Sequence, residues 1–185
     1  PYGLRRASLG VIRILEARGF AVTASELFET ALDEYQATDV ELDVTGEALL
    51  SELGGFLTRR LRYLLADRYP TDVVDAVLAA SSENVVGVRG RVEALAELRR
   101  EADFEDLALG FKRVVNILEK EEEAGVDTSM SVEPSAFEDA SEETLFEAYR
   151  SASERVDSAV AERDWESACE ALISLKEPVD TFFDS

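Results

Sequence analysis

Apolar residues recur at intervals of three and four along most of this 185-residue chain, and stretches in which apolar and polar residues alternate are almost absent. Such spacing places the apolar side chains on one face of an α-helix. Near the start, for example, Leu4, Val11 and Leu15 fall on one stripe, and Gly19 follows as a helix stop. The pattern predicts an all-α fold, a multi-helix bundle.

Helix start and stop signals divide this pattern into segments. The predicted helices cover residues 4–17, 25–35, 46–68, 70–80, 85–100, 103–123, 141–162 and 164–175, with one turn at 134–138 and a short last helix that begins at Pro178. We expect caps at Ser25, Thr45, Ser141 and Asp164, because their side-chain oxygens can accept hydrogen bonds from the first turn of a helix. Connections are predicted at 36–44 and 81–84, and a mobile loop at 125–133.

Gly54 and Gly55 lie inside the predicted helix 46–68. Two glycines within a helix cost roughly 2 kcal/mol relative to alanine, because glycine loses the most backbone freedom on folding. We therefore expect a kink, a break or very close packing at this position.

The composition excludes several kinds of chemistry. The chain has no histidine and one cysteine, Cys169, so it lacks the residues of a Ser-His-Asp or Cys-His nucleophile, a histidine zinc site or an internal disulfide. The helical spacing of Trp165, Cys169 and Leu172 predicts a packing seam rather than a redox site. The acidic runs lack the loop of an EF-hand, and no glycine-rich phosphate loop occurs. We predict no catalytic and no metal-binding residues.

The formal net charge of −21 disfavours binding to a polyanion. Residues 1–120 hold 15 Lys and Arg against 21 Asp and Glu, whereas residues 121–185 hold 4 against 19. A nucleic-acid surface would therefore have to lie in the first two thirds of the chain. No apolar run approaches the roughly 18 residues that span a bilayer, and no signal-peptide pattern opens the sequence, so we expect a cytoplasmic protein that binds no membrane.

Two arginine pairs could hold phosphates. Arg6 and Arg13 are seven residues apart and lie nearly in line on one helix face. Arg59 and Arg62 are three apart and share a face. A guanidinium can donate two parallel hydrogen bonds to phosphate oxygens. The alternatives are that the first pair binds carboxylates of neighbouring helices, and that the second pair stabilises the negative end of its own helix.

Lys112, Arg113 and Asn116 are the residues that we expect to contact RNA most directly. Lys112 and Asn116 are four apart, so one helix edge presents a cation beside an amide. The cation can hold the backbone while the amide reads a base edge. The alternative is that Asn116 hydrogen-bonds within the bundle. Four apolar neighbours are expected in the core: Phe111, Val114, Val115 and Leu118.

Several blocks of sequence occur in an order that resembles one protein family. They are residues 1–14 (PYGLRRASLGVIRI), 61–65 (LRYLL), 72–79 (DVVDAVLA), 111–118 (FKRVVNIL) and 177–184 (EPVDTFFD). Their order is similar to that in the beta subunit of bacterial two-subunit glycyl-tRNA synthetase. The resemblance implies a C-terminal fragment in which residues 1–83 precede a helical anticodon-binding domain at 84–185. That domain would be incomplete, because the family's Asp-Ala-Leu-Arg signature is absent.

The same resemblance implies a role in binding tRNA(Gly). In that family the alpha subunit forms glycyl-adenylate from glycine and ATP and transfers the glycyl group, while the beta subunit recognises the tRNA. The assembly is a heterotetramer of two alpha and two beta chains. The fragment would then be non-catalytic and hold no cofactor, the ATP and Mg²⁺ being used by the full enzyme, and DNA would not be a partner. The alternative is a purely structural helical module for alpha/beta assembly.

Overall fold

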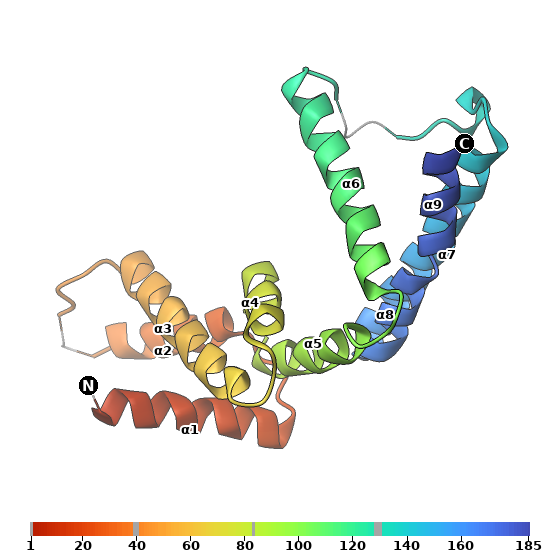
Figure 1. Cartoon of the computed structure of the whole chain (residues 1–185). Coiled ribbons are helices and arrows are strands. Elements are labelled where there is room, and N and C mark those ends of the chain that lie inside the picture. The colour runs from red at the N-terminus through yellow and green to blue at the C-terminus, as the bar shows by residue number, and fades with distance from the viewer. Residues whose placement is uncertain (1, 39–40, 83, 128–130) are drawn as a thin grey trace. The chain divides into compact units, whose positions relative to one another are not determined.

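The computed structural model describes residues 2–38, 41–82, 84–127 and 131–185, and every regular element in these ranges is a helix (Figure 1). The predicted all-α fold is therefore confirmed. The elements are α1 (Tyr2–Arg18), α2 (Ala24–Gln36), α3 (Gly46–Ala66), α4 (Thr71–Ala80), α5 (Val85–Leu98), α6 (Phe104–Glu123), the 3₁₀ turn η1 (Pro134–Ala136), α7 (Ala140–Glu162), α8 (Trp165–Ile173) and α9 (Lys176–Asp184).

The chain forms two compact units, Pro1–Ala96 and Glu97–Ser185, called unit 1 and unit 2. The boundary falls near the end of α5. The functional division predicted at residue 83, with an incomplete anticodon-binding domain after it, stays a prediction. The mobility predicted for residues 125–133 also stays a prediction, and residues 128–130 lie outside the described ranges.

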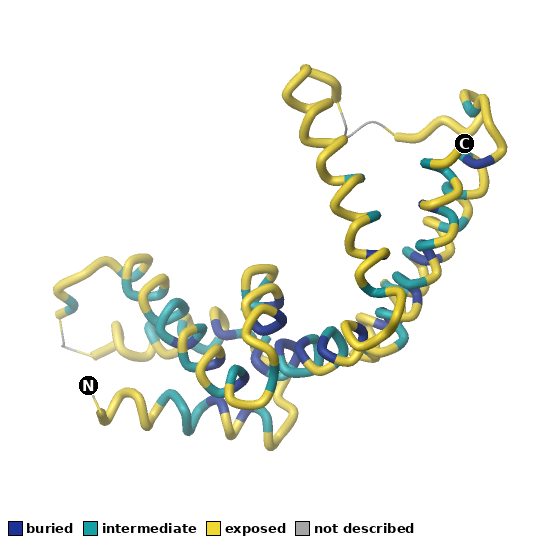
Figure 2. Tube along the Cα trace, in the orientation of Figure 1, coloured by how far each residue is buried: buried dark blue, intermediate teal, exposed yellow. Residues whose placement is uncertain are grey.

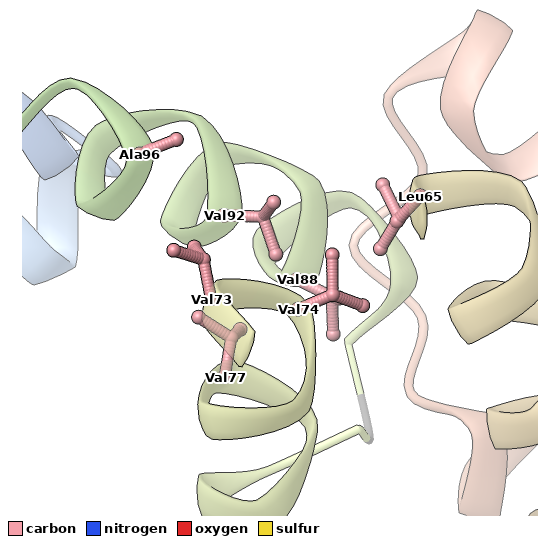
Figure 3. Packing of buried hydrophobic residues seen from close by; sticks show 7 residues of the cluster. All are labelled: Leu65, Val73, Val74, Val77, Val88, Val92 and Ala96. Carbon is pink, nitrogen blue, oxygen red and sulfur yellow. The ribbon is translucent and has the colours of Figure 1, made fainter. Parts of the chain in front are cut away.

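Unit 1 is built around α3, which contacts α1, α2 and α4. Leu57 and Leu61 of α3 pack against Ile12 and Leu15 of α1, together with Ala24 and Val85. One turn further along, Leu65 enters a second cluster with three valines of α4 and with residues of α5 (Figure 3). Those partners are Val73, Val74, Val77, Val88, Val92 and Ala96. Full burial of one such side chain contributes about 1.5–3 kcal/mol, so these two clusters determine how the helices of unit 1 pack.

Unit 2 has a smaller core. α7 contacts α8 and α9, and α9 also contacts α6. The buried cluster consists of Ala152 of α7, Leu175 immediately before α9, and Val179 of α9. A salt bridge supports the contact to α6, because Lys176 Nζ lies 2.7 Å from Asp103 Oδ1 and 3.4 Å from Asp106 Oδ2. The predicted seam of Trp165, Cys169 and Leu172 is half-buried on α8.

The helix caps agree with the sequence at some positions and differ at others. Thr45 and Asp164 cap α3 and α8 as predicted, and Gly19 follows α1 in the left-handed conformation (φ +63°). The caps predicted at Ser25 and Ser141 are wrong. Thr23 caps α2 and Asp139 caps α7, each two residues earlier. In both cases a glutamate at the third helical position returns a hydrogen bond to the cap backbone, and this capping box selects the earlier residue.

The last helix also begins earlier than predicted, at Lys176 instead of Pro178. Proline is tolerated in the first turn because the N–H that it lacks has no partner within the helix there. Val179 N donates to Leu175 O (3.0 Å) immediately after the proline. Pro178 therefore lies inside the first turn of α9 and does not mark its start.

Of the three alternatives predicted at Gly54 and Gly55, the break and the close packing are wrong, and the kink stays a prediction. α3 is unbroken through both residues, and a Cβ atom at Gly54 would meet no atom within 4 Å. Gly54 O accepts a hydrogen bond from Thr58 Oγ1 (3.0 Å). Both glycines line a hollow of about 440 Å³ beside α2. The backbone cost of these glycines is thus not repaid by packing.

Gly54→Ala is therefore expected to raise the free energy of unfolding of unit 1 by about 0.5–1 kcal/mol, through the lower entropy of the unfolded chain. Urea unfolding followed by circular dichroism measures the change. Gly19→Ala is the matched control. This substitution also adds a methyl group in open space. It is nevertheless expected to lower the free energy of unfolding of unit 1 by about 1 kcal/mol, because the φ of +63° at residue 19 disfavours a Cβ atom. A destabilised Gly54→Ala variant would contradict this account.

Candidate nucleic-acid interface

Arg6 and Arg13 lie on the exposed side of α1. Within the described part of the chain, neither guanidinium makes a hydrogen bond or an ion pair. The carboxylate pairing that the sequence left open for them is thus not observed among those residues. Both positive charges are available to an anion from outside the chain.

Arg62 is engaged within unit 1. Its Nε donates to Asp75 Oδ1 (2.6 Å) and its Nη2 to Asp75 Oδ2 (2.8 Å), which joins α3 to α4. The same hydrogen bonds raise the pKa of Arg62 and lower the pKa of Asp75. Arg59 is exposed, and no partner for it occurs in the described ranges. The two arginines are therefore not equivalent, since Arg62 would have to leave Asp75 to hold a phosphate.

Lys112 and Asn116 lie on α6 with exposed side chains. No hydrogen bond to Asn116 from within the bundle is found among the described residues, and Lys112 makes no ion pair there. Arg113 differs from both, because its guanidinium lies 3.8 Å from the ring centre of Phe183 on α9. This cation–π contact fixes Arg113 between two helices of unit 2. Lys112 and Asn116 therefore form the accessible edge.

The core positions predicted around these residues are wrong. Phe111, Val115 and Leu118 are 36%, 50% and 45% exposed, and Val114 is half-buried. The reason is that α9 covers the beginning of α6, where Val179 lies against Gly110 and where Leu107 is buried. Figure 2 shows the exposed surface along most of the rest of α6. An apolar helix face is buried only where another element covers it.

The sequence did not predict a second group of residues in unit 1. A hollow of about 410 Å³ is lined by Arg13, Tyr63 and Arg68, among others. Only Arg13 of these three is a sequence-predicted candidate. Tyr63 stands in an apolar run and Arg68 in a turn, and no local spacing joins either residue to α1. Tertiary packing alone brings them together.

The exposed groups just described are guanidinium, ammonium, amide and phenol, which bind anions and base edges or stack on bases. Within the described ranges, no group of three or more His, Cys, Asp or Glu side chains is placed to hold a metal ion. None of the described helices combines the length and the apolar character needed to cross a membrane.

Comparisons with known proteins match the chain to a synthetase subunit. A family model described as glycyl-tRNA synthetase beta subunit matches residues 1–79. Over its whole length the chain is 39% identical to the glycine–tRNA ligase beta subunit of Geotalea daltonii and 38% identical to that of Anaeromyxobacter sp. strain K. The chain spans 26% of the length of each relative. Its place within such a subunit, predicted to be C-terminal, stays a prediction.

Leu107→Ala is expected to lower the free energy of unfolding of unit 2 by about 2–5 kcal/mol, because the side chain is 6% exposed on the covered part of α6. Leu118→Ala, on the same helix but 45% exposed, should change it by no more than about 0.5 kcal/mol. Urea unfolding followed by the fluorescence of Trp165 reports on unit 2. Equal losses would show that the second half of α6 is buried after all.

Asp75→Asn is expected to destabilise unit 1 at neutral pH and to have no effect in strong acid. Arg62 lowers the pKa of Asp75 in the folded state. This contact therefore stabilises the fold above the ordinary carboxyl pKa, and the stabilisation is lost as the pH falls through the lowered value. Thermal unfolding across this range measures the difference from the unsubstituted chain, with Asp67→Asn as a control. A difference that persists in acid would show a role for Asp75 other than this ion pair.

Proposed function

Because the chain belongs to the glycyl-tRNA synthetase beta subunit family, we propose that it is part of a glycine–tRNA ligase and helps to hold tRNA(Gly) for glycylation. The chemistry is assigned to an alpha subunit in a complex of two alpha and two beta chains. ATP and Mg²⁺ are used by that complex and not by residues 1–185. This complex acts in the cytoplasm, where tRNA is aminoacylated.

The edge formed by Lys112 and Asn116 carries this proposal. Both side chains are exposed and unpaired among the described residues, on a chain whose net charge is −21. An ammonium group holds a phosphate through its charge, and an amide can donate to and accept from the edge of an unpaired base. One turn of α6 therefore offers both the group that positions an RNA and the group that reads it.

Such binding would help catalysis without any reacting group. Contacts to one part of a tRNA lower the free energy of the complex and hold the acceptor end where the alpha subunit can reach it. The benefit is entropic, because a bound and oriented substrate reacts without a further loss of translational freedom. A non-catalytic chain can thus contribute to the rate of glycylation.

A second function, a structural module for alpha/beta assembly, is favoured by the apolar face of α6. Phe111, Val115 and Leu118 are exposed there, which is typical of a surface that meets another protein. Helical geometry places Leu118 on the side of α6 opposite Asn116. A substitution at Leu118 can therefore test the apolar face without altering the side of α6 that carries Asn116.

The full ligase, with complete alpha and beta subunits, is the protein to test with labelled tRNA(Gly) and a non-cognate tRNA over a range of salt. Lys112→Ala is expected to weaken both complexes and to reduce the slope of log K against log salt by about 1, since one phosphate contact is lost. Asn116→Ala should weaken the cognate complex more than the non-cognate one, because it removes a base contact.

Arg155→Ala is the control, because it also removes from unit 2 one exposed charge, on α7, that has no partner among the described residues. It should leave both complexes nearly unchanged. If Lys112→Ala and Asn116→Ala behave like this control, the α6 edge does not bind tRNA. In that case a loss of alpha/beta assembly in Leu118→Asp would favour the structural module instead.

A further inference from the structure

The hollow of about 410 Å³ in unit 1 is formed where α1 and α5 meet the end of α3. α1 contributes Arg13 and Glu16, the end of α3 contributes Tyr63 and Leu64, and Arg68 comes from the turn that follows. Its volume lies within the range of roughly 300–1,000 Å³ found for sites that take small molecules. The hollow is therefore large enough for part of a larger ligand, and its lining combines two leucines and a tyrosine with charged side chains.

The charges around this hollow favour an anion. Arg13, Arg68 and Arg89 line it together with the carboxylates of Glu16 and Asp67. Glu16 Oε1 lies 3.2 Å from Arg89 Nη1, and the same arginine also pairs with Glu93 (Nε to Oε1, 3.3 Å), so the charge of Glu16 is partly offset. Arg13 and Arg68 make no hydrogen bond or ion pair through their side chains in the part of the chain that the structure describes. Two guanidiniums are thus left for an external anion, opposed by the carboxylate of Asp67.

Tyr63 adds an aromatic surface to the same hollow. It is 71% exposed, although its neighbour Leu64 is half-buried and Leu65 is buried in the core of unit 1. An exposed phenol ring beside two unpaired arginines combines the two contacts that proteins use for unpaired nucleotides, which are base stacking and phosphate binding. A base within a double helix could not stack on this ring, because neighbouring bases already cover both faces of the base.

We propose that this hollow binds one unpaired nucleotide of the tRNA, with its phosphate held by Arg13 and Arg68 and its base stacked on Tyr63. The proposal rests on the proposed function, and it adds an RNA contact in unit 1 that is independent of the edge on α6. Leu64 and Leu65 also line the hollow, and Arg89, which pairs with both Glu16 and Glu93, weakens the repulsion between Glu16 and the phosphate.

The test measures tRNA(Gly) binding by the full ligase over a range of salt. Tyr63→Ala is expected to weaken binding on the order of 5- to 100-fold through lost stacking, whereas Tyr63→Phe keeps the ring and should bind nearly as well as the unsubstituted enzyme. Arg13→Ala and Arg68→Ala should each reduce the slope of log K against log salt by about 1. All three residues are exposed, so the variants are expected to fold.

Two matched controls lie outside the hollow. Arg18→Ala removes from the helix of Arg13 an exposed arginine that has no partner in the described ranges. Tyr149→Ala removes a tyrosine of α7 that is 58% exposed. Arg18→Ala should not reduce the salt slope as Arg13→Ala does, and Tyr149→Ala should not weaken tRNA binding as Tyr63→Ala does. Tyr63→Ala and Tyr63→Phe that weaken binding equally would overturn the stacking contact. Variants of the hollow that behave like these controls would overturn the proposal as a whole.

The variants of α6 separate this proposal from the proposed function. If Lys112→Ala weakens tRNA binding and Tyr63→Ala does not, the stretch binds tRNA but the hollow does not contribute. If neither variant has an effect, both proposals fail. If the hollow is instead a site for a free nucleotide, the enzyme should bind adenosine monophosphate, and Tyr63→Ala should abolish that binding without changing tRNA binding. This result would also overturn the proposal.

Discussion

The arrangement of unit 1 depends on the burial of one row of leucines. Leu57, Leu61 and Leu65 follow one another at four-residue spacing on α3 and are 3%, 1% and 3% exposed. The first two pack against α1, and the third packs against α4 and α5. Since this burial fixes the rotation of α3 about its axis, residues between the leucines such as Arg59 and Tyr63 are turned outward. The polar surface of unit 1 therefore follows from apolar packing on the other side of the helix.

Local pattern is sufficient to predict the helices, because helical periodicity and capping are properties of neighbouring residues. The cap predictions that failed concern choices between similar residues. Serine, threonine and aspartate can all cap a helix, and the glutamates that complete the capping boxes at Thr23 and Asp139 were the signal that distinguished them. Gly54 and Gly55 show a different case, since α3 continues unbroken through two residues that disfavour a helix.

The site depends more strongly on contacts between helices, and those are not visible in local spacing. Lys112 and Asn116 are exposed on α6, a helix that α9 covers only at its beginning. The pairing of Arg62 with Asp75 joins residues 13 positions apart, and Arg113 meets a ring on another helix. In the sequence alone, Arg62 and Arg113 look like available cations. Conversely, the position of Tyr63 beside Arg13 requires the packing of α1 on α3.

The half-covered helix α6 has a consequence for how copies of this chain behave together. Its exposed apolar residues would attract those of another copy, while the net charge of −21 makes the copies repel each other. Repulsion acts over roughly 10 Å at 0.1 M salt and about 3 Å at 1 M, whereas apolar contact is not screened. Added salt therefore removes the repulsion and leaves the attraction. Whether copies of this chain associate in solution therefore depends on its acidic surface and on ionic strength, as well as on its fold.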